Sequence, residues 1–141
     1  MTDRPRTQSD AFARAKERGR HLGATILSDP DMLTGEAFAH RLGLTVSDLR
    51  DLKQTHAVLV LPDPSPRGSR YPAWQIDATG QPFPVMPALF DTLGDSGWTI
   101  YRFLTQSQPE LAGQTALEAL RDGRNALVVR FAHSIAAGTF A

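Results

Sequence analysis

Cysteine is absent from this chain of 141 residues. Its absence excludes disulfides, thiol nucleophiles and cysteine-based zinc sites, and it fits a protein of the reducing cytoplasm. Long apolar runs are also absent, since no stretch approaches the roughly 18 residues that span a bilayer, and the polar start lacks the apolar core of a signal peptide. The sequence therefore predicts a cytoplasmic protein with no membrane partner.

A surplus of charge of either sign is missing too. Lys and Arg together number 15, Asp and Glu together number 15, and the formal net charge is zero. No global field therefore draws the chain toward nucleic acid or an anionic membrane, and any DNA binding must come from a local patch. The hydrophobic fraction of 41% and the charged fraction of 21% are those of a globular protein, with one compact domain or two small ones.

Signatures of catalysis and of metal binding are sparse. The four histidines are scattered, with no HExxH pattern, so we expect neither a metal site nor a cofactor. The run Gly94-Asp95-Ser96-Gly97 is superficially like the nucleophile motif of trypsin-type serine proteases. Such an enzyme needs two β-barrels, however, and a turn between helices explains these residues. We therefore expect no catalytic residues and no enzymatic activity.

The most specific local pattern lies in residues 34–54. A small residue, a glycine four positions later and a branched apolar residue six after that are typical of a helix-turn-helix, and Ala39, Gly43 and Leu49 occupy those places. A threonine followed three residues later by an aspartate resembles a capping box that opens the second helix. The alternative is an ordinary helical hairpin that binds no DNA.

The second helix of this motif has both acidic residues and residues suited to DNA contact on its expected outer face. Asp48 and Asp51 would repel phosphate, which keeps the hairpin alternative open. The other polar residues suit phosphates and base edges. The candidate DNA contacts in this helix and its cap are Thr45, Ser47, Arg50, Lys53 and Gln54.

Two apolar segments of strand character follow the motif. Residues 57–61 and 70–76 flank a loop rich in proline and glycine, so we expect a short β-hairpin placed like the wing of a winged helix. Arg67 and Arg70 would lie near its tip and reach a DNA backbone. A hairpin that only covers the hydrophobic side of the motif is the alternative, and the two interpretations are compatible.

Apolar residues at helical spacing predict helices on both sides of this region. An amphipathic helix is expected from Asp10, and four short helices follow the hairpin, the last from about Asn125 to Ala137. Trp74 and Ile76 are expected to pack between the two halves of the chain. The fold class is thus mainly α: a helix-turn-helix with a short wing-like β-hairpin, followed by a small C-terminal helical domain.

Several segments carry a resemblance to a known family. They are Tyr71-Pro72-Ala73-Trp74-Gln75-Ile76, Met86-Pro87-Ala88-Leu89-Phe90 and the run Leu111-Ala112-Gly113-Gln114-Thr115-Ala116-Leu117-Glu118-Ala119-Leu120-Arg121-Asp122-Gly123. The last is similar to the signature L-x-G-x-[ST]-P-x-E-A-L-x-x-G. In content and order these segments resemble the toxin-binding domain of Xre/MbcA/ParS-type antitoxins. Ala116 departs from the family's usual proline, which is favourable but not required at a first helical turn.

The resemblance implies an antitoxin of a type II toxin-antitoxin module. Its partner would be a RES-domain toxin, an NAD-degrading enzyme that the antitoxin binds and occludes, and its own operator DNA is a further expected partner. In that family the C-terminal end approaches the toxin's active-site cleft. The matching regions here are the last helix and the tail, with Arg130, His133, Phe140 and Ala141.

Three parts follow from this interpretation. They are an N-terminal arm and helix in residues 1–33, the helix-turn-helix with its hairpin in 34–77, and a helical toxin-binding domain in 78–141. A homo-oligomer, or a hetero-oligomer with the toxin, is expected. The alternative is a winged-helix transcription regulator whose C-terminal half serves for dimerisation or for sensing a small ligand, and a purely structural interaction protein is a weaker third.

Overall fold

The computed structural model describes residues 3–64 and 68–138, and within the first helix it places the side chains of residues 11–18 and 22–27. This part of the chain is mainly helical with one small antiparallel sheet, which confirms the predicted fold class. None of its helices is long and apolar enough to cross a membrane. The helices are α1 (Asp3–Leu27), α2 (Gly35–Leu42), α3 (Val46–Gln54), α4 (Met86–Leu93), α5 (Gly97–Thr105), α6 (Ala116–Arg121) and α7 (Asn125–Ala136).

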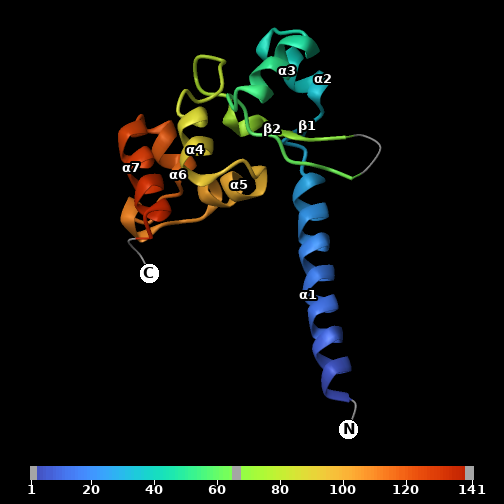
Figure 1. Cartoon of the computed structure of the whole chain (residues 1–141). Coiled ribbons are helices and arrows are strands. Elements are labelled where there is room, and N and C mark those ends of the chain that lie inside the picture. The colour runs from blue at the N-terminus through green and yellow to red at the C-terminus, as the bar shows by residue number, and fades with distance from the viewer. Residues whose placement is uncertain (1–2, 65–67, 139–141) are drawn as a thin grey trace.

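Helix α1 begins at Asp3, seven residues before the predicted start at Asp10. Figure 1 shows it extending from the body of the molecule as a single rod, with its N-terminal end far from the other helices. Its C-terminal end is its root, where Ile26 and Leu27 pack against the main hydrophobic core. The other helices form the body, with α2 and α3 at one end of it.

Two hydrophobic clusters lie on either side of one extended segment, residues 58–61, which we call the dividing segment. Val58 and Val60 pack into a cluster formed by the helix-turn-helix. Leu59 and Leu61 pack into the larger cluster formed by the C-terminal helices. Because side chains alternate along an extended chain, one stretch of four residues serves both cores. The two halves of the protein therefore pack against opposite sides of the same segment.

The hairpin is present, but its two segments share fewer paired residues than the sequence suggested. Residues 57–61 and 70–76 meet at the single pair Leu61 and Arg70, whose backbone hydrogen bonds measure 2.8 and 2.9 Å. The returning chain forms β2 (Tyr71–Pro72), which pairs with β1 (Met32–Leu33) just after α1. After Pro72 it enters a short 3₁₀ turn rather than continuing as a strand.

The side chain of Gln75 replaces the missing strand partner. Gln75 is fully buried, and its carboxamide bonds both backbone groups of Leu59: the Leu59 N–H donates to Oε1 at 2.6 Å and Nε2 donates to the Leu59 carbonyl at 2.8 Å. Burying a backbone N–H or C=O without a hydrogen-bond partner is costly. The Gln75 amide therefore supplies the partners that the backbone of Leu59 lacks once the strand pairing has ended.

Replacing Gln75 with leucine should lower the free energy of unfolding by about 3 kcal/mol, because it leaves the buried N–H and C=O of Leu59 unpaired at about 1–3 kcal/mol each. Chemical denaturation monitored by circular dichroism measures this. The matched control is Gln81→Leu at an exposed position, which should change stability by under about 0.5 kcal/mol. Equal stability of the two variants would contradict the role given to the Gln75 amide.

The segment from Tyr71 to Ile76 contacts both clusters, as predicted for Trp74 and Ile76. Tyr71 stacks on Phe38 of α2 with ring centroids 5.1 Å apart, and Ile76 packs on the same cluster. Trp74 packs against the larger cluster, 6.0 Å from the ring of Tyr101 on α5. This segment and the dividing segment together fix the orientation of the two halves.

Candidate functional site

The helix-turn-helix is built as the sequence pattern indicates. Thr34 caps α2 by accepting a hydrogen bond from the Ala37 N–H at 3.2 Å. Gly43 ends the helix in the left-handed conformation at φ 72°, which glycine adopts without strain. Ala39 and Leu49 are each only 2% exposed where the two helices cross. The predicted positions therefore have their predicted structural roles.

The capping box at the start of α3 changes the electrostatics of the expected DNA-facing surface. The Asp48 N–H donates to Thr45 Oγ1 at 3.0 Å, and the Thr45 N–H donates to Asp48 Oδ2 at 3.2 Å. The Asp48 carboxylate is thus turned toward the helix N-terminus, whose dipole favours a negative charge. Of the two acids that argued against DNA contact, Asp51 alone has no capping role.

The remaining polar candidates on α3 lie on its solvent side. Ser47, Arg50, Lys53 and Gln54 are all exposed. Within the described part of the chain, neither Arg50 nor Lys53 forms an ion pair. Both cations can therefore meet a phosphate or a base edge without first breaking an internal contact.

Val46 is a residue that the sequence interpretation missed. It is the first residue of α3 and is 48% exposed, unlike Leu49, which is buried, and Leu52, which is partly buried. The N-terminal turn of a recognition helix is the part that contacts base edges, where an apolar group can pack on a thymine methyl. An apolar residue directly after the cap was the signal available in the sequence.

Of the two predicted wing residues, Arg70 does not stand where the sequence placed it. Arg67 lies outside the described residues. Arg70 is only 5% exposed, with its guanidinium 3.6 Å from the Asp63 carboxylate and donating to the Gly68 carbonyl at 3.0 Å. The expectation that Arg70 reaches DNA is therefore wrong in this fold, because its charge is used inside the loop to hold residues 63 and 68 together.

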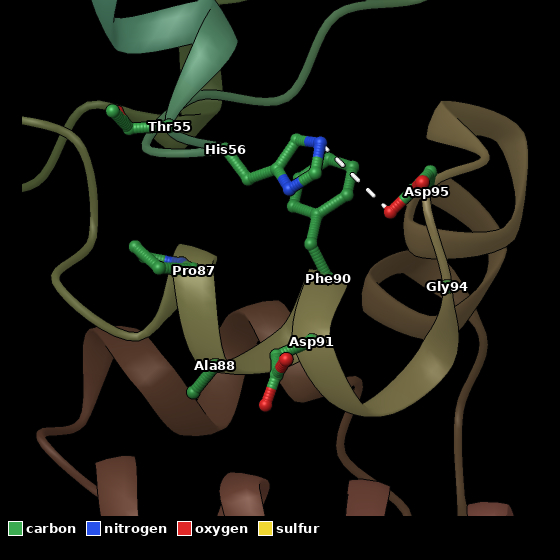
Figure 2. Close-up of a pocket in the computed structure, with 8 residues that line it drawn as sticks. All are labelled: Thr55, His56, Pro87, Ala88, Phe90, Asp91, Gly94 and Asp95. Carbon is green, nitrogen blue, oxygen red and sulfur yellow. Dashed lines mark ion pairs between the residues drawn. The ribbon is translucent and has the colours of Figure 1, made fainter.

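A hollow of about 560 Å³ lies where α3 ends and meets α4. Figure 2 shows His56 above Phe90, with its ring turned toward Asp95 and with Asp91 pointing away from this pair. The His56 and Phe90 rings are stacked at 4.7 Å, and His56 Nε2 is 3.9 Å from Asp95 Oδ1. The histidines looked unconnected in the sequence, because folding alone brings His56 to Phe90. The contact attaches the end of α3 to the C-terminal half.

The signature-like run around α6 has mainly structural roles. Thr115 and Glu118 form a second capping box, with hydrogen bonds of 3.0 and 2.8 Å. Ala116 is fully buried at the first position of α6, and Gly123 ends the unit at φ 81°. The run thus forms α6 and the turn that leads into α7.

Helix α7 packs through one face and leaves the other open. Val128, Phe131 and Ala132 are buried against the larger cluster. Arg130 and His133 are exposed, three residues apart and so on one face of the helix. Phe140 and Ala141, the other predicted toxin contacts, lie outside the described residues.

Comparison with known proteins gives one result on the fold. No protein-family model matches the sequence, and no curated protein matches it. Among solved structures, the chain is similar to the NMR structure of Rv2175c, with a TM-score of 0.64 over 77% of this chain and 84% of that one. The sequences are 23% identical, so the similarity shows a shared fold.

Proposed function

We propose that this chain is an antitoxin that binds and occludes a RES-type, NAD-degrading toxin through its C-terminal helices, and that its helix-turn-helix binds the operator of its own genes. The observation that carries the proposal is the pairing of two open faces on one body. The outer face of α3 offers Arg50 and Lys53, and the outer face of α7 offers Arg130 and His133. Figure 1 shows the two helices on different sides of the molecule.

The arrangement supports simultaneous binding of two partners. A toxin on α7 would leave α3 uncovered, so one molecule could hold the toxin and DNA together. The dividing segment and the stack of His56 on Phe90 join the two halves, so α3 and α7 keep a fixed relative orientation. Such a body positions a bound toxin at the operator, as autoregulation by a toxin-antitoxin complex requires.

The test on the toxin side is co-purification of the tagged chain with the protein encoded by the adjacent gene. The wild-type chain should retain that protein. Replacing Arg130 and His133 together with glutamate should weaken the complex at least about a hundredfold, because two contacts of about 1.4 kcal/mol or more become repulsive. Arg41→Glu, on the exposed surface of α2, is the control that should keep the complex. Failure of the wild-type chain to retain its neighbour would reject the antitoxin proposal.

A winged-helix regulator that binds DNA but no toxin is the second candidate. The capping role of Asp48 favours it, since that interaction ties the carboxylate to the helix N-terminus, where the helix dipole offsets part of its charge. This function predicts binding to the upstream DNA with strong salt dependence and no complex with the adjacent gene product. Co-purification together with a gel-shift assay therefore separates the two functions.

A further inference from the structure

The rod α1 exposes the two most accessible large hydrophobic side chains of the described chain. Phe12 is 72% exposed and Leu22 is 61% exposed. A helix of 25 residues is about 37 Å long, and Figure 1 shows most of α1 standing clear of the body. A helix without tertiary packing is marginal in water, and Gly19 and Gly23 weaken this one further. Its apolar face therefore needs a partner.

The apolar residues of this face have a symmetric spacing. Phe12, Ala15, Gly19 and Leu22 follow one another at intervals of 3, 4 and 3 residues, the spacing of a coiled-coil seam. Phe12 and Leu22 lie equally far from residue 17, and so do Ala15 and Gly19. In an antiparallel pair with its axis at residue 17, large residues oppose large ones and small residues oppose small ones. We call these four residues the α1 seam.

The root of α1 selects the antiparallel arrangement. In a parallel pair Ile26 would have to meet Ile26 of the second copy, but Ile26 already packs against the core of its own chain. Beside it, a groove of about 600 Å³ opens between α1, the loop at residues 62–64 and α5. Leu22, Trp98 and Tyr101 are among its lining residues. An antiparallel second helix would lay Phe12 beside Leu22, at the mouth of this groove.

Charge complementarity favours the same arrangement. Residues 3–27 contain six Lys or Arg against three Asp or Glu, whereas residues 28–141 contain nine against twelve. The antiparallel register sets the first turn of one α1, whose sequence includes Arg4 and Arg6, beside the root of the other. Asp29 and Asp31 are exposed there. Burial, and then the charge of Asp29, raise the pKa of the groove residue Tyr101, so the acidic field reaches the groove.

We propose that a second copy of this chain covers the α1 seam, with the two α1 helices antiparallel about residue 17 and Phe12 of each copy seated at the root groove of the other. The interface is isologous, since Phe12 meets Leu22 twice by symmetry. Lys16 of each copy lies opposite Arg18 of the other near the axis, which opposes pairing weakly because exposed charges are screened. The pairing does not depend on the proposed function, and it stands whether or not the chain binds a toxin or DNA.

Sedimentation equilibrium of the full chain tests the interface. The wild-type chain should be a dimer in the micromolar range, and Phe12→Ser with Leu22→Ser should raise the dissociation constant at least about a hundredfold, because four apolar side chains per dimer lose their burial. Val46→Ser replaces an exposed apolar residue on α3 and should leave the dimer unchanged. A wild-type monomer, or a double variant that dimerises like the wild type, would overturn the proposal.

Cysteine cross-linking tests the direction of the helices, and the absence of native cysteine makes it unambiguous. Phe12→Cys and Leu22→Cys chains, oxidised separately, should form no disulfide dimer, since like positions lie about 15 Å apart along an antiparallel pair. An equimolar mixture should form a cross-linked heterodimer. Efficient cross-linking of either variant alone would indicate parallel helices and overturn the assignment.

Discussion

Replacing Arg50 and Lys53 together with alanine should weaken binding to duplex upstream DNA by about a hundredfold at moderate salt. Both side chains are exposed on α3 and have no ion pair within the described residues, so each removed cation would cost about 1.4 kcal/mol. The dependence of affinity on salt should also flatten, by about one unit of slope for each phosphate that is no longer neutralised. Fluorescence anisotropy with a labelled duplex over a range of salt concentrations measures both effects.

Two further variants make this experiment specific to the face of α3. Asp51→Asn removes the acid that has no capping role and should tighten binding several-fold. Arg130→Ala removes an exposed arginine from α7, outside the helix-turn-helix, and should leave DNA affinity unchanged. If the Arg50 and Lys53 double variant binds as tightly as the wild type, this motif is a helical hairpin that does not contact DNA.

Gly97→Ala should lower the free energy of unfolding by about 3 kcal/mol or more, the largest stability effect that we expect from adding one methyl group. Gly97 is the first residue of α5, and a β-carbon there would overlap the backbone carbonyl of Val60 in the dividing segment. Backbone cannot move aside as a flexible side chain can, so α5 would have to shift away from the dividing segment, against which both cores pack. Thermal and chemical denaturation measure the loss.

Gly35→Ala is the matched control, because Gly35 is also the first residue of a helix. A β-carbon there would meet a Tyr71 ring carbon at 3.5 Å and a Leu49 methyl at 3.8 Å, which are ordinary contacts. That variant should stay within about 1 kcal/mol of the wild type. If the two alanine variants are equally stable, the close approach of α5 to the dividing segment is not a constraint on this fold.

The sequence was sufficient where structure depends on neighbours along the chain. The helix-turn-helix was predictable because its left-handed glycine and its capping box act within one turn of their position, and the small residue at the helix crossing lies only ten residues from Leu49. The run around α6 was readable for the same reason, since Thr115 and Glu118 pair three residues apart. Helical periodicity likewise placed the last four helices, each of which buries one face.

The sequence was insufficient where a residue acts on a distant one. Gln75 looks like a strand residue, and its bonds to Leu59 exist only because the chain returns past the dividing segment. Arg70 looks like an exposed wing cation, yet Asp63 and Gly68 take up its guanidinium. Gly97 looked like part of a turn, and its close approach to Val60 is a property of the packed halves. Such contacts depend on long-range placement that no local pattern encodes.

The residues that carry the family resemblance around α6 also act locally. They are caps, turn glycines and buried alanines that shape the support for α7. They account for a conformation that displays Arg130 and His133. In the proposed function a toxin is recognised through that displayed face, so α7 is where a functional test has to act.

Growth and cellular NAD content on co-expression with the adjacent gene test the proposed antitoxin function most directly. Induction of the adjacent gene alone should stop growth and deplete NAD, and co-expression of the wild-type chain should restore both. The chain with glutamate at residues 130 and 133 should fail to restore them while remaining folded by circular dichroism. A harmless adjacent gene product, or NAD depletion that the wild-type chain does not relieve, would contradict the proposed function.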